Sequence, residues 1–543
     1  MSLGVYRRRL RSLGGSRPQR PQPAHILPPA LHHPWTGLIS PGTAAAAGGE
    51  MFSSSPPPSG PLEKLFQYID LHQDEFVQTL KEWVAIESNS VQPVLHFRQE
   101  LSRMMAVATD KLQCLGAAVD SVDLGSQQLP NGQSLPLPPI ILAELGNDPK
   151  KPTVCFYGHL DVQPAQQSDG WLTDPHTLTE VGGKLYGRGA TDNKGPVLAW
   201  INAVSTFRAL EQDLPVNIKF ILEGMEEAGS VALEELVTKE KHRFFSSVDY
   251  IVISDNLWIS RTKPALTYGT RGNSYFMVEV KCRDQDFHSG TFGGILNEPM
   301  AELIALLDSL VDSTGHILIP GIYDQVAPLT EEEKKTYETI DLDLEEYQNS
   351  SQVEKFLYGT KEEILMHLWR YPSLSIHGIE GAFDKPGTKT VIPGRVVGKF
   401  SIRLVPHMNV SVVEKQVKQH LEAVFSKRNS SNQMSVSLAL GLQPWITNIN
   451  DNQYLAAKAA IKTVPSFSRV SVFGIEPDMI QDGSTIPIAR IFQDIIQKSV
   501  MMLPLGAVDD GEHSQNEKIN RWNYIEGSKL FAAFFLELAK LHE

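Results

Sequence analysis

The sequence predicts an α/β protein with a mostly parallel sheet flanked by helices. Residues 154–157, 217–222 and 250–254 are short apolar runs of the length expected for buried strands. Each run ends at polar residues, and stretches with helical spacing of apolar positions alternate with the runs. This repeated order of strand, polar tip and helix is typical of parallel sheets that carry helices on both faces.

Further elements are predicted by periodicity on either side of these strands. Apolar residues recur at helical spacing in 62–83, 97–115, 196–210 and 523–541, and 140–145 has the pattern of a strand. Predicted helices therefore stand before, between and after the strands, as a helix-flanked sheet requires.

The length of the chain predicts more than one domain, because 543 residues exceed what a single compact core holds. Residues 1–60 carry six arginines, one acid and many Pro, Gly, Ala and Ser residues, which predicts a disordered, targeting-like leader. Residues 61–265 and 446–543 are predicted to form the domain with the parallel sheet. Residues 266–445, where the strand–tip–helix order is lost, are predicted to form an inserted α+β domain.

Composition excludes several classes of function. Lys and Arg total 49 and Asp and Glu total 63, so the formal charge is −14, which argues against nucleic acid as a partner. No apolar run approaches membrane-spanning length, so no membrane partner is expected. Cys114, Cys155 and Cys282 are isolated from one another, which excludes a cysteine-based zinc site and a disulfide framework.

The glycine-rich turn at 187–195 has two interpretations. A phosphate cradle is one, but the spacing does not match a P-loop, and Asp192 at its centre would repel phosphate. The turn therefore makes more sense if Asp192 faces a cation.

Polar residues with metal-ligand chemistry gather at the predicted strand tips. Taken singly, each is more often structural, but together they favour a site: His159, Asp161, Asp192, Glu226, Glu227, Asp255 and His513. Two imidazoles and three carboxylates suit a pair of borderline divalent ions, and Zn²⁺ and Mn²⁺ both fit this mixture. Asp161 is placed to accept the second N–H of His159, and Glu226 and Glu227 can divide metal binding from proton transfer.

As a set, these motifs are similar to those of a known family. The stretches 158–164, 187–195 and 511–514, with the pairs Glu226–Glu227 and Ser254–Asp255, resemble the di-metal aminoacylase and carnosinase-type metallopeptidases. The resemblance runs in order from about residue 62 to the C-terminus, and the stretches 509–517 and 377–381 resemble its carnosine dipeptidase branch. It implies that the larger domain is catalytic and that the inserted domain serves as lid and dimerisation domain.

The resemblance also implies a role for each site residue. Asp192 would bridge two divalent ions per subunit, with Zn²⁺ favoured and Mn²⁺ as the alternative. His159 and Asp255 would complete one site, and Glu227 and His513 the other. Glu226 would be the general base that deprotonates a metal-bridging water, and Asp161 would support His159.

The substrate-binding residues implied by the resemblance are Asp255, His288, Thr390, Arg403, Thr485 and His513. Arg403 would bind the carboxylate of a dipeptide bidentately, a geometry that suits arginine, although from its alternation with apolar residues it could equally be an ordinary sheet arginine. His288 would reach the site of a partner subunit in a homodimer and support the oxyanion. From the sequence alone it reads as a polar loop histidine.

The implied activity is metal-dependent hydrolysis of Xaa-His dipeptides such as carnosine (β-alanyl-L-histidine) and homocarnosine. A broad-specificity dipeptidase or N-acyl-amino-acid hydrolase is the alternative on the same site. A non-catalytic binding protein on this fold is the alternative of another class, and the retention of Glu226 and all metal ligands argues against it.

The predicted location is extracellular. The resemblance favours secretion, and the Asn-x-Ser sequences at Asn349, Asn409 and Asn429 are glycosylation acceptors in a secreted protein. The N-terminal stretch has no clear signal peptide, so a cytoplasmic location is the alternative. Residues 465–472 depart from the family pattern as an apparent insertion ahead of the Thr485 region.

Overall fold

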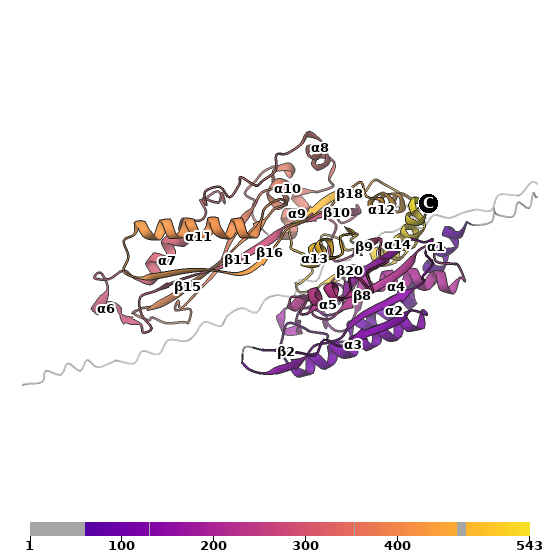
Figure 1. Cartoon of the computed structure of the whole chain (residues 1–543), viewed down its shortest axis with the longest axis horizontal. Coiled ribbons are helices and arrows are strands. Elements are labelled where there is room, and N and C mark those ends of the chain that lie inside the picture. The colour runs from indigo at the N-terminus through magenta and orange to yellow at the C-terminus, as the bar shows by residue number, and fades with distance from the viewer. Residues whose placement is uncertain (1–59, 130, 352, 464–473, 543) are drawn as a thin grey trace, which may run out of the picture. The chain divides into compact units, whose positions relative to one another are not determined.

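The fold is seen in a computed structural model that describes residues 60–542 apart from 130, 352 and 464–473 (Figure 1). The predicted leader, except for its last residue, and the predicted insertion at 465–472 lie outside the described residues.

A nine-stranded sheet carries the strands that the apolar runs predict. Its path is β1 (Ala118–Val122), β4 (Ile140–Leu145), β8 (Asn217–Glu223), β5 (Thr153–His159), β9 (Tyr250–Ile253), β19 (Ser499–Met502), β10 (Ala265–Thr270) and β17 (Trp445–Ile446), with β18 (Asp478–Asp482) paired to β10. The four central strands β8, β5, β9 and β19 are mutually parallel. The predicted α/β fold with a mostly parallel, helix-flanked sheet is confirmed.

Helices cover both faces of this sheet. Successive side chains of each buried strand point to opposite faces, so each face has its own hydrophobic core packed against helices. On β5, Phe156 packs in one core, where its ring centroid lies 3.9 Å from that of Trp200. Tyr157 points to the other core, with Phe492 at 5.7 Å. The first core is formed with α1 (Pro61–Leu71), α2 (Gln73–Val84), α3 (Leu95–Cys114), α4 (Lys194–Ala209), α12 (Asn452–Thr463) and α14 (Arg521–His542), and the second with α5 (Leu233–Glu240) and α13 (Pro487–Ile496).

A second sheet of four antiparallel strands lies within the predicted insertion. Its order is β13 (Ser373–Glu380), β15 (Arg395–Leu404), β11 (Gly272–Lys281) and β16 (Gln433–Leu442). Strand β11 alternates buried and half-buried residues, and Phe276, Val278 and Val280 pack with α7 (Pro299–Asp308) and α11 (Val410–Lys427). One face of the sheet is therefore covered by two helices (Figure 1).

Short elements complete the description. They are β2 (Ser126–Gln128), β3 (Ser134–Pro136), β6 (Thr179–Val181), β7 (Lys184–Tyr186), β12 (Phe287–His288), β14 (Val391–Ile392), β20 (Lys518–Asn520), α6 (Ser289–Phe292), α8 (Glu331–Thr339), α9 (Leu344–Ser351) and α10 (Lys361–Trp369). Strand β10 begins at Ala265 and belongs to the nine-stranded sheet, although most of it lies beyond the predicted boundary at residue 265. The domain boundaries at 265 and 446 stay a prediction. Among the described helices, none combines the length and apolarity that crossing a bilayer demands.

Candidate metal centre

The candidate centre lies at the edge of the nine-stranded sheet where its parallel strands end. His159 is the last residue of β5, Asp255 comes two residues after β9, and Glu226 and Glu227 come shortly after β8. Parallel strands deliver their carboxyl ends to one edge, which is where open α/β sheets bind ligands. Gly158 is required there, because a Cβ at this position would lie 2.4 Å from Cγ2 of Val197 on α4.

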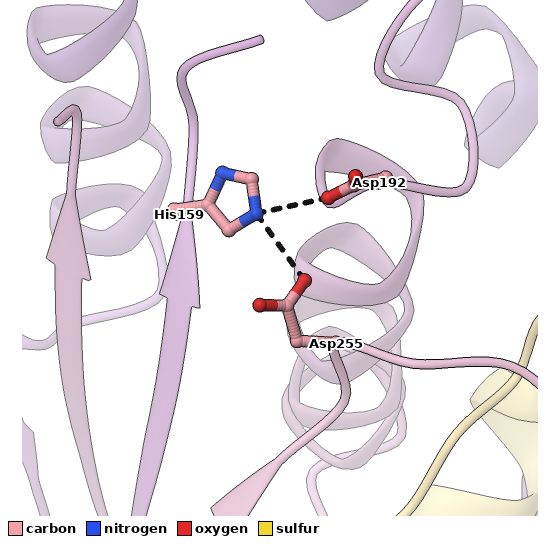
Figure 2. Close-up of side chains that lie close together, drawn as sticks. All are labelled: His159, Asp192 and Asp255. Atoms are coloured by element: carbon pink, nitrogen blue, oxygen red, sulfur yellow. Dashed lines mark hydrogen bonds and ion pairs between the residues drawn. The ribbon is translucent and has the colours of Figure 1, made fainter. Parts of the chain in front are cut away.

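His159 joins two carboxylates (Figure 2). Its Nε2 lies 3.0 Å from Oδ1 of Asp192 and 3.2 Å from Oδ1 of Asp255, and its side chain is 1% exposed. One donor atom from each of the three residues lies within 4.8 Å of the others. A single divalent cation fits among these atoms.

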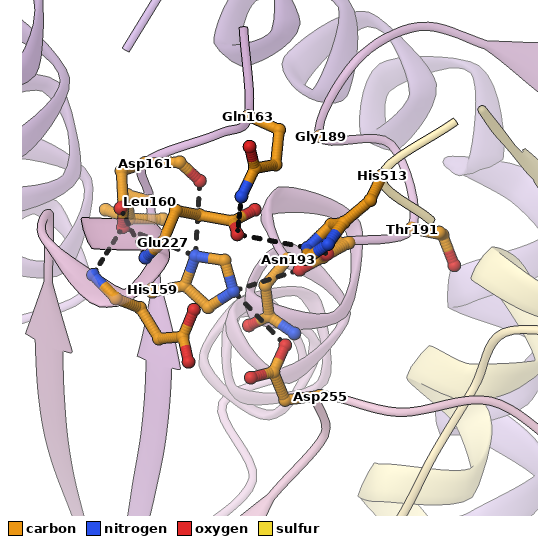
Figure 3. Close-up of polar contacts among 12 residues, drawn as sticks. His159, Leu160, Asp161, Gln163, Gly189, Thr191, Asn193, Glu227, Asp255 and His513 are labelled. Carbon is orange, nitrogen blue, oxygen red and sulfur yellow. Dashed lines mark hydrogen bonds and ion pairs between the residues drawn. The ribbon is translucent and has the colours of Figure 1, made fainter. Parts of the chain in front are cut away.

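A second group, which includes Glu227 and His513 (Figure 3), shares Asp192 with the first. Nε2 of His513 lies 3.0 Å from Oδ2 of Asp192 and 3.0 Å from Oε2 of Glu227. The two carboxylate oxygens of Asp192 therefore face different histidines. Two imidazoles, two terminal carboxylates and one shared carboxylate fit a pair of divalent ions with Asp192 between them.

The grouped imidazoles and carboxylates shift one another's pKa values. Burial opposes the ionisation of Asp192, but hydrogen bonds from His159 and His513 bring its pKa below the usual value. The bonds to Asp192 and Glu227 raise the pKa of His513 to about 11. Burial raises the pKa of Asp255 to about 6, against the attraction of His159.

Asp161 contacts His159 and also accepts hydrogen bonds from the turn that carries Glu226 and Glu227. Nδ1 of His159 is 3.2 Å from the Asp161 backbone oxygen and 3.3 Å from Oδ1. The fully buried carboxylate accepts hydrogen bonds from the Ser90 hydroxyl at 2.5 Å and from the amides of Glu226 and Glu227 at 3.2 and 3.0 Å. Asp161 thus links the strand that carries the histidine to the turn that carries both glutamates.

Glu226 differs from its neighbour Glu227 in its surroundings. The Glu227 carboxylate receives hydrogen bonds from Gln163 and His513, whereas no hydrogen bond to the Glu226 carboxylate occurs among the described residues. Burial raises the pKa of Glu226 well above its usual value. His159 opposes this rise, and Asp255, Asp161 and Glu227 reinforce it. A carboxylate with raised pKa and free oxygens suits proton transfer.

Arg403 and Thr485 are brought together, as a carboxylate clamp requires. Nη1 of Arg403 donates to the Thr485 hydroxyl at 2.6 Å. Nearby, Oδ2 of Asp482 accepts a hydrogen bond from Asn256 at 3.3 Å, and Asn256 follows Asp255 in the chain, so Asp482 links the Thr485 loop to the segment that carries Asp255. Asp482 also stabilises the charge of Arg403.

Sequence reasoning missed a second arginine, Arg271. It stands one residue before β11, donates to the Gly483 carbonyl at 2.9 Å and to the Ser373 hydroxyl at 3.0 Å, and interacts with Arg403. Burial, reinforced by the repulsion from Arg403, lowers the pKa of Arg271 to about 10. A charged residue at a strand junction was its only sequence signal.

His288 and Thr390 lie together but apart from the centre. The backbone amide of Ser289 donates to the Thr390 carbonyl at 3.2 Å, next to the paired strands β12 and β14. These strands adjoin the Arg395 end of β15, where the amide of Gly394 donates to Asp286. Arg403 is eight residues further along β15, roughly 26 Å at the rise of a strand. Within one chain the structure does not bring His288 to Arg403.

Comparisons with known proteins define the class. The model of Peptidase family M20/M25/M40 matches residues 155–537, and the chain belongs to this family of peptidases.

Two relatives align with most of this chain. Beta-Ala-His dipeptidase of Homo sapiens is 82% identical over 492 residues, which cover 91% of this chain and 96% of that protein. Cys-Gly metallodipeptidase DUG1 of Saccharomyces cerevisiae is 44% identical over 477 residues, covering 87% and 97%.

Solved structures share the fold. The crystal structure of human carnosine dipeptidase 1 is similar with a TM-score of 0.80 and 81% identity, covering 89% of this chain and all of that one. The M20 family metallo-carboxypeptidase Sso-CP2 from Sulfolobus solfataricus gives a TM-score of 0.73 at 26% identity, covering 86% and 100%.

Proposed function

We propose that this protein is a metal-dependent dipeptidase that hydrolyses Xaa-His dipeptides such as carnosine and homocarnosine. The observation that carries the proposal is Asp192, whose two oxygens face two separate imidazole–carboxylate pairs. Membership of the peptidase family and 82% identity to a Beta-Ala-His dipeptidase support the substrate class.

The proposed chemistry assigns different tasks to the two adjacent glutamates. When bound, two divalent cations, with Zn²⁺ favoured and Mn²⁺ as the alternative, would lower the pKa of a water and polarise the scissile carbonyl. Glu226 would accept the proton of that water as a C–O bond forms, and would pass it to the leaving amine as the C–N bond breaks. Glu227 would hold metal, and Asp161 would keep His159 and both glutamates in place.

Recognition of the dipeptide would rest on its carboxylate. Arg403 offers a planar fork of N–H donors, Thr485 lies 2.6 Å from it, and Arg271 adds positive charge beside the pair. Asp255 and the half-exposed His513 would contact the substrate as well as the metal. A clamp at this place selects substrates that end one residue beyond the scissile bond.

The proposed function is tested by a substrate comparison on protein loaded with Zn²⁺ or Mn²⁺. We expect kcat/KM for carnosine to exceed that for Cys-Gly and N-acetyl-histidine by about 10-fold or more. The 44% identity to a Cys-Gly metallodipeptidase makes preference for Cys-Gly the competing outcome. The C-terminal amide of carnosine should have a lower kcat/KM than carnosine itself. Arg403→Gln should reduce this difference in kcat/KM between the two substrates. Turnover of N-acetyl-histidine alone would instead indicate an acyl-amino-acid hydrolase.

A homodimer is the second part of the proposal. His288 and Thr390 lie far along the four-stranded sheet from Arg403, and they would serve the site of a partner subunit, where His288 would support the oxyanion. The exposure of the His288 side chain is compatible with this role. The inserted domain would then act as lid and dimerisation domain.

Co-expression of two variants tests this arrangement. Glu226→Gln and His288→Ala should each be impaired alone, because one lacks its base and the other its partner histidine. A mixed dimer contains one site with an intact Glu226 and an intact His288 from the other subunit. Random pairing should then restore about a quarter of wild-type activity. Activity no greater than the sum of the separate variants would show that His288 does not act across subunits.

Secretion is proposed on the same resemblance. The asparagines of the three Asn-x-Ser sequences, Asn349, Asn409 and Asn429, are exposed and therefore accessible to glycosylation. Recovery of the protein from the medium of producing cells, with a mass that glycosidase treatment lowers, would support secretion, and retention of unmodified protein in the cells would oppose it.

A further inference from the structure

We infer that Glu517 is a positioning residue that holds the loop carrying Asp192, so that both metal sites depend on it. The inference rests on the proposed function, because it concerns the same centre. Glu517 is fully buried and is separated from Asp192 by 325 residues of chain. It is not among the metal ligands or the substrate-binding residues assigned above.

The Glu517 carboxylate accepts hydrogen bonds from several backbone amides of the 188–192 loop. Oε1 accepts hydrogen bonds from the amides of Gly189, Thr191 and Asp192, each at 3.1 Å. Oε2 accepts from the amide of Gly189 at 3.1 Å and from Nη1 of Arg188 at 2.7 Å. Converging backbone amides of this kind normally form an anion-binding concavity, and here a side chain of the protein fills it.

Strand pairing places Glu517 at this position. Strand β20 begins at the next residue and pairs with β7, with Lys518 opposite Tyr186. The Gly187 amide donates to the Glu517 carbonyl at 2.9 Å, so the loop departs directly from the paired strands. Gly189 then turns with a positive φ of 89°, which lets its amide point at the carboxylate.

A carboxylate is required by the donor arrangement. Every group facing Glu517 in these contacts is an N–H donor, so both oxygens must accept. A glutamine of the same shape has one accepting oxygen, and its NH₂ would oppose either Arg188 or the loop amides. Arg188 is 4% exposed and would lose the partner that balances its buried charge.

The consequence reaches both metal sites because Asp192 is shared. Oε1 of Glu517 accepts the Asp192 amide and so fixes the backbone of this residue. With the backbone in this position, one carboxylate oxygen of Asp192 faces His159 and the other faces His513. A shift of the Asp192 backbone would misplace both oxygens together. Loss of a ligand that serves one ion, such as His513, would weaken only that ion.

Metal titration of metal-stripped, full-length protein tests the inference. Competition with a chromophoric chelator gives the affinities for Zn²⁺ and Mn²⁺ directly, without an activity assay. We expect Glu517→Gln to weaken both bound ions by about 10- to 100-fold, the range seen when residues that orient metal ligands are changed. Excess metal should restore much of kcat, and KM for carnosine should stay unchanged, because the Arg403 clamp is untouched.

Glu302→Gln is the matched control. Glu302 is 1% exposed, accepts a hydrogen bond from Asn432 at 2.7 Å, and belongs to α7 beneath the four-stranded sheet. The same chemical change there should leave the affinities for both ions at the wild-type value, even if it lowers thermal stability.

Three results would overturn the inference. Wild-type affinity for both ions in Glu517→Gln is one, and weakening of a single ion is another. If Glu517→Gln does not fold, Glu517→Asp keeps the charge but withdraws the oxygens from the loop, and wild-type affinity for both ions in that variant is the third. Failure of the wild-type protein to hydrolyse carnosine would refute the proposed function alone, because the affinity comparison does not depend on substrate.

Discussion

Glu226→Gln should lower kcat for carnosine by about a thousand-fold while both metal ions stay bound, within the range for loss of a general acid–base. The amide keeps the shape of the side chain but cannot accept a proton from the nucleophilic water or deliver one to the leaving amine. Steady-state release of histidine, together with metal analysis of the same sample, measures both quantities.

The structure explains why Glu226→Gln should lower kcat without lowering the metal content. The Glu226 carboxylate receives no hydrogen bond from the described residues and faces neither His159 nor His513 at ion-pair distance. Burial and the neighbouring carboxylates raise the pKa of Glu226 above its usual value. Removing it therefore removes proton transfer and leaves the ligand set intact.

Glu227→Gln provides the adjacent control. Glu227 lies 3.0 Å from Nε2 of His513 and belongs to one metal group, so its replacement should reduce the content of one ion. If Glu226→Gln lost metal and Glu227→Gln did not, the two assignments would be reversed. Full activity of Glu226→Gln would exclude it as the base.

Asp192→Asn should abolish tight binding of both ions and, with it, hydrolysis. Its carboxylate is common to the two groups, one oxygen 3.0 Å from each histidine. Because replacing residues that merely orient ligands weakens metal binding by 10- to 100-fold, loss of the shared ligand should cost each ion at least about 100-fold. Chelator competition and metal analysis after dialysis would measure the loss.

Asp255→Asn is the comparison that makes this result specific. Within the described part of the chain, Asp255 belongs to one metal group, with His159 and Asp192, so its loss should release one ion and spare the other. Equal loss of both ions in both variants would indicate that the ions bind only as a pair. Retention of either ion at wild-type affinity in Asp192→Asn would show that Asp192 does not bridge.

Local sequence patterns determined much of the catalytic scaffold. The apolar runs at 217–222 and 250–254 became β8 and β9, and the acids after them lie at the ligand edge. This succeeded because burial on both faces demands continuous apolar strands, and a parallel sheet delivers every strand end to the same edge. Residue type and position at the strand tips therefore indicated which side chains the structure brings together, and their roles as metal ligands stay predictions.

Tertiary structure alone decided how the ligands are held and shared. The two oxygens of Asp192 are divided between His159 and His513 by the course of the backbone. Glu517 contacts that backbone from a distant part of the sequence, and the pairing of β11 with β15 brings Arg271 close to Arg403. Neither contact leaves a periodic signal, because one buried hydrogen-bonded side chain imposes no pattern on its neighbours in sequence. The sequence by itself determined which residues can bind metal, whereas long-range strand pairing decided which backbone amides and oxygens meet.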